Sequence, residues 1–468
     1  MESTKISVNI QRVLNTVLDQ YEPLKTIVKA ISDIGGRSLL VGGAVRDLLL
    51  GLPVKDLDIE VHAVALEELE KLLKQLGRVD LVGKSFGVFR LHGLDVDWSL
   101  PRKDSEGRKP DVVIDPAMKI KDAFARRDLT INAIGIDLVT FELIDPYDGF
   151  NDLKKGTLRA PDKKKFIEDP LRFYRVMQFI SRFEMTPDDQ LHEICKTMDI
   201  SDVSVERIET EFEKLMLKSK RPSLGVRWLQ YIERLKEVLP ELWGIVGVPQ
   251  DEAWHPEGDV FEHTMQCLDA AAAMDYENDK QKLVVMFAVL CHDLGKAKTT
   301  EKIGGVWKSI GHSKEGEKLS KDLLRRITKK KNMLETIGKL VRYHMSPSQF
   351  VASGAKPSAY KRLARKIAPG GTLELLAKVA LADKLGRNPI KGVPLKKEFP
   401  AITKFLDNAK KANVEKVPES PVLMGRDLMD VVAPGPQMGK LLRDAYEIQI
   451  EQGICDKKKL KQMVLDKR

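Results

Sequence analysis

The sequence predicts an α+β protein in which a small mixed sheet near the N-terminus precedes a long all-helical remainder. Between Ser38 and about Ile144, short runs rich in β-branched and apolar residues alternate with helical patterns such as Leu66–Leu76. From about Ile167 onward the strand patterns disappear, and prolines and glycines separate one helical pattern from the next. Because 468 residues exceed one ordinary core, we expect two to four domains.

Changes of pattern along the chain suggest the domain limits. A helical pattern over residues 5–34 stops at Gly35-Gly36, and the sheet-containing pattern begins directly after it. Near the C-terminus we expect two helices joined by the turn Pro434–Pro436, followed by a lysine-rich helix with a solvated face. The expected divisions are an N-terminal helical segment 1–36, a sheet-containing domain 37–160, a helical neck and body 161–248, a helical domain 249–400 and a C-terminal segment 401–468.

Composition favours a soluble globular protein with a polyanionic partner. The formal net charge is +9, which favours encounter with nucleic acid but has no bearing on the fold. Four cysteines without a C-x-x-C motif are expected to be reduced, mostly buried thiols of a cytoplasmic protein. The longest apolar run, Leu283–Cys291, is too short to span a bilayer, and the N-terminus does not resemble a signal peptide. We therefore expect no membrane partner.

The first candidate site combines a glycine turn with paired acids. A strand ending in Gly42-Gly43 that opens a helix lets backbone N–H groups approach a phosphate, and Arg46 follows within the first turn. Asp56 and Asp58 are two apart on the next strand, so both side chains point to one face while the apolar residues between and after them pack behind. Paired carboxylates are typical ligands of Mg²⁺, which takes its remaining ligands from water and substrate phosphates.

A third acid is expected from the neighbouring strand. Asp95 and Asp97 share a face there, and we favour Asp97 as the additional metal ligand. Glu60 lies on the same strand face as the acid pair, and we expect it to be exposed to solvent.

Leu40–Val61 resembles motif A of the class II tRNA nucleotidyltransferase and bacterial poly(A) polymerase family. Segments that resemble motifs B to E of that family follow in the same order: Ala125–Ala133, Asp145–Leu153 with Leu158-Arg159, Glu168–Arg175, and Ser204–Glu211. The resemblance implies that residues 37–160 form a polymerase-β-like nucleotidyltransferase head. It also implies Mg²⁺ as cofactor, tRNA, CTP and ATP as partners, and selection of the nucleotide by side chains without a template.

Motif B suits a triphosphate beside a ribose. Arg127 is expected to bind phosphate and Asp128 the 2′-hydroxyl, while Arg126 is either a contact or only a surface charge. The resemblance adds Gly43 and Asn132 to the nucleotide-binding residues. Arg102–Asp111 resembles the flexible loop that relatives use to switch from C to A addition, which argues against an enzyme that adds only C.

Motif D offers a means of choosing the base. Asp169 and Arg172 are three apart on one helix face, where a carboxylate can accept from an exocyclic amine and a guanidinium can donate to a ring acceptor. Cytosine and adenine both present that pair of groups, whereas guanine and uracil do not. Alternatively, Asp169 before Pro170 caps a helix. Arg175 is a further nucleotide contact by resemblance, and Gln178 stands where some relatives carry an arginine.

A second candidate site lies in the helical remainder. His292-Asp293 ends an apolar helical pattern, and the ordered series His263, His292-Asp293 and Asp383 resembles the HD metal-dependent phosphohydrolase superfamily. The resemblance implies an all-α HD domain over 249–400 and assigns His312 and His344 to a second metal. Imidazole and carboxylate ligands suit a divalent transition metal or Mg²⁺ without choosing among them. We expect His255 to lie at the entrance of this domain.

Together these features predict a cytoplasmic enzyme that adds CCA to the 3′ end of tRNA from CTP and ATP. The HD domain is expected to add a phosphatase or 2′,3′-cyclic phosphodiesterase activity. One alternative is an enzyme that adds only A, or a poly(A) polymerase. Another is an HD nucleotide or RNA phosphohydrolase whose head merely binds tRNA. The sequence leaves a homodimer open.

Overall fold

The computed structural model describes residues 4–21, 23–54, 56–75, 77–82, 87–93, 96–104 and 112–466. The chain divides into two compact units, Met1–Val203 and Ser204–Arg468. This division falls inside the segment 161–248 that the sequence assigns to one neck and body, and the finer domain limits stay predictions. Within the described ranges, no helix has the length and apolar character needed to cross a membrane.

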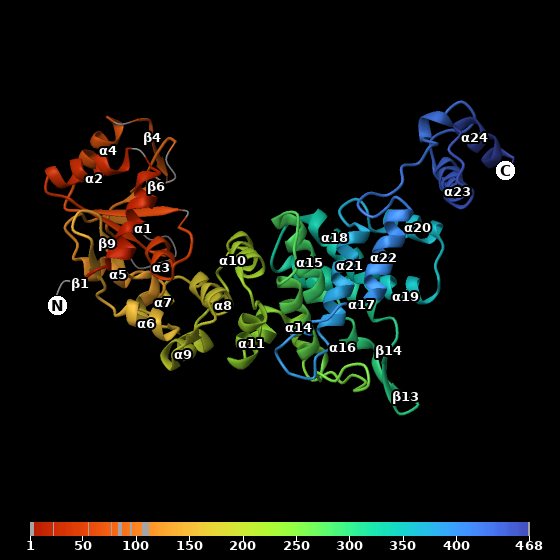
Figure 1. Ribbon diagram of the computed structural model, residues 1–468, viewed down its shortest axis with the longest axis horizontal. Helices are drawn as coiled ribbons and strands as arrows, with labels where there is room; N and C mark the ends of the chain where they lie inside the picture. The colour runs from red at the N-terminus through yellow and green to blue at the C-terminus, as the bar shows by residue number, and fades with distance from the viewer. Residues whose placement is uncertain are drawn as a thin grey trace. The chain divides into compact units, whose positions relative to one another are not determined.

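The first unit is built on an eight-stranded sheet, drawn in red and orange in Figure 1. β3 and β6 are parallel and the other neighbours are antiparallel, so the predicted small mixed sheet and the α+β class are confirmed. In spatial order the strands are β1 (Thr4–Lys5), β10 (Glu142–Ile144), β9 (Gly135–Asp137), β2 (Arg37–Val41), β3 (Leu57–His62), β6 (Val96–Ser99), β5 (Val88–Leu91) and β4 (Val79–Val82).

Alternation along β3 places its apolar residues on one face of the sheet and its acids on the other. Leu57, Ile59 and Val61 are buried in the larger core cluster, as the sequence predicts. That cluster also contains apolar residues of α1 (Val8–Asp19), α2 (Leu24–Asp33), α3 (Gly43–Leu49) and α4 (Leu66–Lys74). A smaller cluster with α5 (Ile120–Ala125) covers part of the other face and leaves the acids of β3 beside it.

The remaining elements of the first unit lie before, within and after motif B. A short pair, β7 (Arg102–Asp104) with β8 (Val112–Ile114), flanks the loop expected over Arg102–Asp111, of which 105–111 lie outside the described residues. A parallel pair that the sequence does not predict joins β11 (Thr157–Leu158) to β12 (Thr186–Pro187). The helices here are η1 (Thr130–Asn132), α6 (Gly149–Lys155), α7 (Lys163–Ile167), α8 (Leu171–Phe183) and α9 (Asp189–Thr197).

The second unit is helical, but it also contains one hairpin that the sequence analysis does not predict. A hairpin of β13 (Thr300–Ile303) and β14 (Val306–Ser309) projects from its helices, although no strand is expected after Ile167. Gly304 and Gly305 both have positive φ, as a two-residue hairpin turn requires, so the signal was present in the sequence. The helices up to residue 325 are α10 (Val205–Lys218), α11 (Ser223–Tyr231), α12 (Leu235–Val238), α13 (Pro240–Trp243), α14 (Val260–Ala272), α15 (Asp279–Cys291), α16 (Lys296–Thr299) and α17 (His312–Arg325).

The C-terminal part of this unit has a small core of its own. The two helices expected around the Pro434–Pro436 turn are only partly correct, because the first is the single 3₁₀ turn η2 (Gly425–Asp427). The lysine-rich end forms a helix with buried Leu460 and Val464, as predicted. The helices after residue 325 are α18 (Lys331–Tyr343), α19 (Ser346–Ala352), α20 (Pro357–Ile367), α21 (Leu373–Leu385), α22 (Pro400–Lys411), α23 (Pro436–Gln452) and α24 (Lys457–Leu465).

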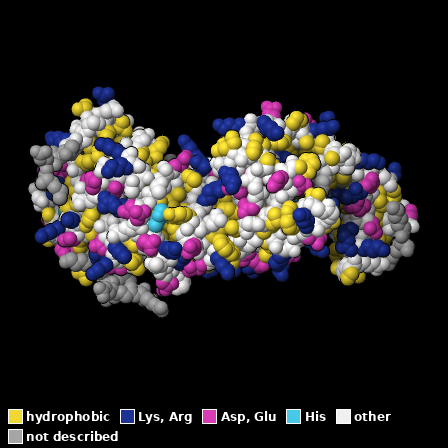
Figure 2. Space-filling model, turned by 90° about the horizontal axis from the view of Figure 1, so that it is seen from below, with side chains coloured by type: hydrophobic (Ala, Val, Ile, Leu, Met, Phe, Trp, Pro, Cys, Tyr) yellow, Lys and Arg dark blue, Asp and Glu magenta, His cyan; other side chains and the backbone are white. Residues whose placement is uncertain are grey.

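Charged side chains do not form a single basic surface on the face that Figure 2 shows. There the lysine and arginine side chains of the described residues are spread among carboxylates. All four cysteines are free thiols; Cys195, Cys267 and Cys291 are buried and Cys455 is exposed.

Candidate active sites in the head and the helical unit

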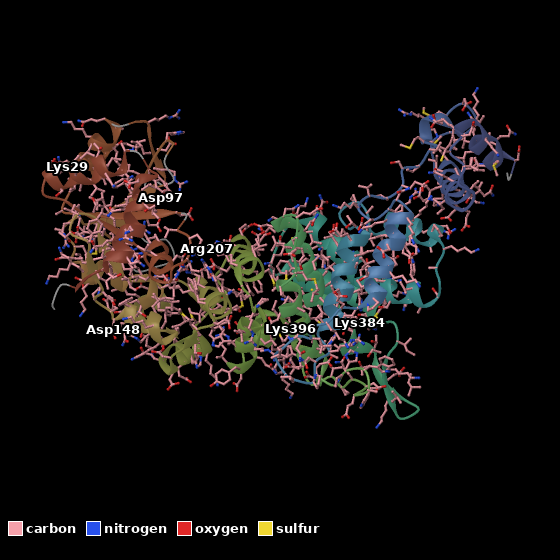
Figure 3. The ribbon with its side chains drawn as sticks, viewed as in Figure 1. Lys29, Asp97, Asp148, Arg207, Lys384 and Lys396 are labelled. Atoms are coloured by element: carbon pink, nitrogen blue, oxygen red, sulfur yellow. The ribbon has the colours of Figure 1, made fainter. Side chains whose placement is uncertain are left out.

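The polar face of the head sheet carries a cleft of about 290 Å³. Asp58 of β3 lies directly opposite Asp97 of β6 in the strand register, and Asp56 comes one residue before β3. Figure 3 labels Asp97 on this sheet. Both signs of charge line the cleft: Asp58, Glu60 and Asp97 on the sheet, and Arg102, Arg126 and Arg127 beside it. Asp95 lies outside the described residues.

Burial and neighbouring carboxylates both raise the pKa of Asp58. Desolvation raises the pKa of its carboxyl group, Arg127 opposes that effect, and the charges of Asp97 and Asp56 raise the pKa further. A cation between these carboxylates would relieve both effects. Asp97 already accepts from Arg90 at 2.7 and 2.8 Å. The arrangement fits a Mg²⁺ site held mainly by Asp56 and Asp58, with Asp97 at its edge.

Glu60 is buried, at 9% exposure, and the expectation that it faces solvent is wrong. Its carboxylate pairs with His62 Nε2 at 2.9 Å and with Arg127 Nη2 at 3.3 Å. Burial alone would raise the pKa of Glu60, but the bond to His62 and the charge of Arg127 bring it below its usual value. Glu60 therefore positions Arg127, which lies far from it in the sequence.

The glycine turn is shaped around Arg127. Gly42 has φ +71°, and a Cβ atom there would lie 3.0 Å from Arg127 Nη1. The guanidinium also lies over the ring of Phe124, 5.1 Å from its centroid. Among the described residues, Arg127 Nε has no hydrogen-bond partner. The guanidinium as a whole lines the cleft, where a phosphate oxygen can accept from it.

Arg46 is buried, at 4% exposure, and lies beneath the turn; it does not line the cleft. Its guanidinium donates to Asp47 Oδ1 at 2.7 and 2.9 Å and to Asn132 Oδ1 at 2.5 Å. It also lies 4.6 Å from the ring centroid of Phe183. A Cβ on Gly43 would be 3.4 Å from Arg46 Nη2, so this residue supports the turn from behind.

Asp128 connects motif B to α8. Its carboxylate accepts from Asn132 Nδ2 at 2.8 Å and from Arg175 Nε at 2.7 Å, and its exposure is 8%. Burial would raise the pKa of Asp128, but the charge of Arg175 and the bond to Asn132 lower it to about 2. The three predicted nucleotide contacts thus bind one another, a pairing that sequence spacing does not reveal.

The proposed base-reading pair lies at the start of α8. Asp169 Oδ1 accepts from Leu171 N at 3.2 Å, which is the helix-start role weighed against base reading. Arg172 donates to the backbone carbonyl oxygens of Lys165 and Arg126. Gln178 is buried within the same helix.

The histidine series of the helical unit converges on Asp293. His263 lies on α14, His292 follows α15, His312 begins α17 and His344 follows α18. On one side, Asp293 Oδ2 is 3.2 Å from His292 Nε2 and 3.7 Å from His263 Nε2. On the other, Asp293 Oδ1 is 3.5 Å from His312 Nε2 and 3.9 Å from His344 Nε2. One carboxylate thus faces two ligand groups.

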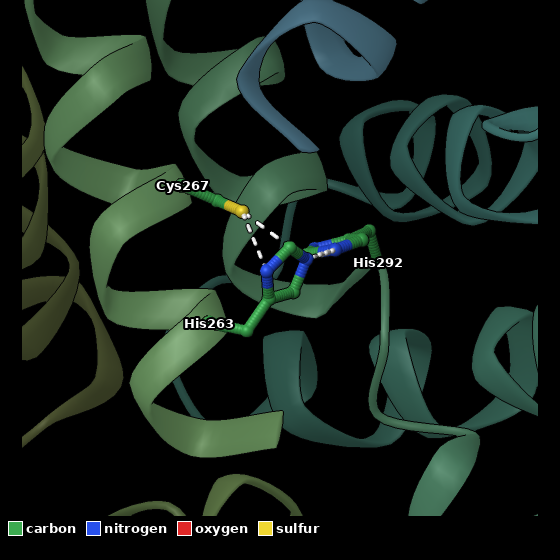
Figure 4. Close-up of side chains that lie close together, drawn as sticks. All are labelled: His263, Cys267 and His292. Atoms are coloured by element: carbon green, nitrogen blue, oxygen red, sulfur yellow. Dashed lines mark hydrogen bonds between the residues drawn. The ribbon is translucent and has the colours of Figure 1, made fainter. Parts of the chain in front are cut away.

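Asp383 of α21 completes the first group, since its Oδ1 is 3.2 Å from His263 Nε2. Cationic neighbours hold both carboxylates: Lys296 Nζ is 2.7 Å from Asp293 Oδ2, and Arg387 Nη2 is 2.7 Å from Asp383 Oδ1. Figure 4 shows His263 and Cys267 on one helix facing His292. The Cys267 sulfur is 3.4 Å from His263 Nε2, and burial raises the pKa of its thiol.

Backbone carbonyls fix the orientation of three of these rings. The Nδ1–H groups of His292, His312 and His344 donate to the carbonyl oxygens of residues 289, 309 and 341 at 2.7, 2.8 and 2.7 Å. Each Nε2 therefore keeps its lone pair for the centre of the cluster, the arrangement that metal-binding histidines require. The donor set fits one or two divalent ions.

The sequence analysis misses one residue of this site, Glu257. Glu257 is buried, and its Oε1 accepts from His263 Nδ1 at 2.6 Å and from His255 Nδ1 at 2.9 Å. Desolvation would raise the pKa of Glu257, but its bonds to these histidines lower it to about 2. His255, which precedes α14, therefore also contacts the histidine cluster through Glu257, a contact that the sequence analysis does not predict. The acid two residues after His255 was the available signal.

The fold and both sites define the class of protein. The family model of the poly(A) polymerase head domain matches residues 38–159, and that of the HD domain matches residues 260–387. The chain is thus a nucleotidyltransferase joined to an HD domain, and both kinds of domain depend on metal ions.

The relatives identify the family. The multifunctional CCA protein of Mannheimia succiniciproducens is 38% identical over 291 residues, which are 60% of this chain and 67% of that protein. That of Nitrosomonas eutropha is 36% identical over 313 residues, or 65% of this chain and 72% of that protein. The chain belongs to the family of multifunctional CCA proteins.

Solved structures show the same fold over nearly the whole chain. The Thermotoga maritima CCA-adding enzyme, solved with tRNA, covers 99% of this chain and 96% of its own, with a TM-score of 0.57 at 18% identity. The Bacillus stearothermophilus enzyme, solved with CTP, covers 94% and 96%, with a TM-score of 0.61 at 20% identity.

Proposed function

We propose that the head adds CCA to the 3′ end of tRNA in the cytoplasm, using CTP and ATP. The 3′-hydroxyl oxygen forms a bond to the α-phosphorus, the bond to the β-phosphate oxygen breaks, pyrophosphate leaves and the hydroxyl proton is lost. The observation that carries this proposal is the single cleft in which Asp58 and Asp97 face Arg102, Arg126 and Arg127. Mg²⁺ bound there would lower the charge repulsion between the attacking oxygen and the phosphates.

Each head residue receives a role from its contacts. Asp56 and Asp58 hold the metal, with Asp97 as an additional ligand. Arg127, presented by the Gly42 turn and Glu60, lines the cleft and binds the triphosphate through its guanidinium. Three further predicted contacts, Arg46, Asn132 and Arg175, act as supports, because each binds a neighbouring side chain. Gly43 lets the backbone come close to the phosphates, and Asp128 binds the 2′-hydroxyl of the ribose.

We assign base selection to Asp169 and Arg172. Arg172 is already bonded to two carbonyl oxygens, which fixes the plane of its guanidinium at the start of α8. A fixed fork beside a carboxylate accepts cytosine and adenine and leaves the acceptors and donors of guanine and uracil unpaired. Each buried unpaired group costs about 1–3 kcal/mol, which is enough to discriminate among the four nucleotides.

For the HD unit we propose hydrolysis of a phosphate or 2′,3′-cyclic phosphate at an RNA 3′ end. The ligands are His263, His292, Asp293 and Asp383 for one divalent ion, and Asp293 with His312 and His344 for a second. A bound Mn²⁺, Fe²⁺, Co²⁺, Ni²⁺ or Mg²⁺ would supply an activated water at neutral pH. The water oxygen forms a bond to phosphorus as a ribose P–O bond breaks, and the released 3′-hydroxyl becomes extendable. A homodimer stays a prediction.

The deciding experiment follows extension of a tRNA transcript that ends at the discriminator base, with Mg²⁺ and CTP, ATP or both. Growth by C, C and A followed by a halt supports the proposal. Addition of A alone would instead indicate an A-adding enzyme, and a long A ladder would indicate a poly(A) polymerase. In the same assays, Asp56→Ala should abolish extension and spare phosphate release, and His292→Ala should do the reverse. Extension unaffected by Asp56→Ala would remove the head assignment.

A further inference from the structure

A second pocket, of about 440 Å³, opens beside the histidine cluster. The β13–β14 hairpin, the loop that contains Trp254, and the end of α21 form its walls. His312 is both a wall of this pocket and one of the proposed metal ligands. A molecule in the pocket would therefore lie next to the reactive centre, and Figure 3 labels Lys384 at this place.

The pocket is cationic. Lys296, Lys308, Lys384 and Arg387 line it, and Asp251 is the carboxylate among its described lining residues. Lys296 and Arg387 are engaged with metal-site carboxylates. In the part of the chain that the structure describes, neither Lys308 nor Lys384 forms an ion pair. Two free ammonium groups beside a metal cluster suit a ligand that carries more than one phosphate.

The pocket also presents two large aromatic surfaces. The sequence has five tryptophans, and Trp254 and Trp307, at 67% and 37% exposure, both line this pocket. An exposed indole can stack on a nucleotide base while the cations beside it pair with the phosphate of the same nucleotide. A phosphoester without a base would use only the cations. Trp98 and Trp228, by contrast, are buried.

The hairpin ties the aromatic surface to the metal ligands. The carbonyl oxygen of Ser309, two residues after Trp307 on β14, accepts from His312 Nδ1 at 2.8 Å. Across the hairpin, Thr300 and Ser309 hydroxyls lie 2.8 Å apart, and Lys302 Nζ is 5.6 Å from the Trp307 ring centroid. Trp307 therefore has a defined position relative to the proposed centre of hydrolysis.

We propose that this pocket binds the last unpaired nucleotides of a single-stranded RNA 3′ end. One base stacks on Trp307 and a neighbouring base on Trp254, Lys308 and Lys384 contact the linking phosphates, and the terminal phosphate reaches the metal cluster. The inference rests on the proposed hydrolase function of the HD unit and adds the subsite by which that unit would favour an RNA end over a free mononucleotide.

The test uses the full-length protein with Mn²⁺ or Ni²⁺ and compares three phosphomonoesters: a hexaribonucleotide with a 3′-phosphate, 3′-AMP, and glycerol 2-phosphate, which has no base. Trp307→Ala and Trp254→Ala should each raise KM for the hexanucleotide by about 5-fold to 150-fold, the range expected for loss of one stacked base. Hydrolysis of glycerol 2-phosphate should stay within about twofold, since stacking is absent there. Trp307→Phe should retain most of the affinity. Trp243→Ala, at 39% exposure on α13 outside the pocket, is the matched control.

Three results would overturn the inference. Unchanged KM for the hexanucleotide in both alanine variants removes the stacking role, and an equal loss on glycerol 2-phosphate shows damage to the centre itself. A KM for 3′-AMP equal to that for the hexanucleotide assigns the pocket to mononucleotides. If the wild type hydrolyses none of the three, the proposed hydrolase function fails separately. Fluorescence anisotropy of the labelled hexanucleotide then tests whether the pocket binds RNA. Weaker binding to the Trp254 and Trp307 variants than to Trp243→Ala supports the inference, and equal binding refutes it.

Discussion

The buried carboxylate of Asp128 gives a quantitative test of how the head is held together. Burial raises its pKa, but Arg175 and Asn132 outweigh that effect and bring the pKa from 3.8 to about 2. At about 1.4 kcal/mol for each pH unit, this drop corresponds to about 2.5 kcal/mol of head stability when the group is ionised. Asp128→Asn removes the negative charge that pairs with the Arg175 guanidinium. We therefore expect the variant to lose about 2.5 kcal/mol at pH 7.

Hydrogen exchange localises this loss to the first unit. Amides of β2 and β3 should exchange about 60-fold faster in Asp128→Asn than in the wild type. Asp33→Asn, a change at an exposed residue of α2, should leave them within about 0.5 kcal/mol. Because the folded pKa is depressed, the contribution is present above about pH 4 and is lost as the pH falls from 3.8 toward 2. Urea unfolding should show the two proteins converging over that window. Equal amide exchange in the two proteins at pH 7 would refute this reasoning. So would a stability difference that does not change with pH.

Two further predictions concern the glycine turn and the histidine cluster. Gly42→Ala places a Cβ atom 3.0 Å from the triphosphate-binding guanidinium at φ +71°, and it should raise KM for CTP and ATP together by about tenfold. Gly51→Ala, at φ +68° with nothing within 4 Å, carries the same backbone strain and should leave both KM values unchanged in extension assays; matching effects would mean that strain alone acts. Glu257→Gln should weaken metal binding to the HD unit by about 10- to 100-fold, measured by titration with Mn²⁺, because the His263 ring loses its carboxylate partner. The exposed control Glu252→Gln should bind metal as the wild type does, and equal affinity of both variants would contradict the role of Glu257.

The sequence alone determined the features that follow from local rules. Alternation along β3 placed Asp58 on one face and Leu57, Ile59 and Val61 on the other, because successive strand residues point to opposite sides. The order of the motifs indicated the family, and the series from His263 to Asp383 indicated the metal cluster. The β13–β14 hairpin was readable in the same way from its paired glycines, although the sequence analysis did not use them.

Tertiary structure alone decided which groups are partners. Glu60 is buried because His62 and Arg127 meet it, Arg46 supports Asn132 from beneath the turn, and His255 joins the cluster through Glu257. Arg46 and Asn132 are 86 positions apart, and Glu60 and Arg127 are 67 positions apart. The free energy of a charged side chain depends on the dielectric and the charges around it, and these come from segments that only the folded chain brings together.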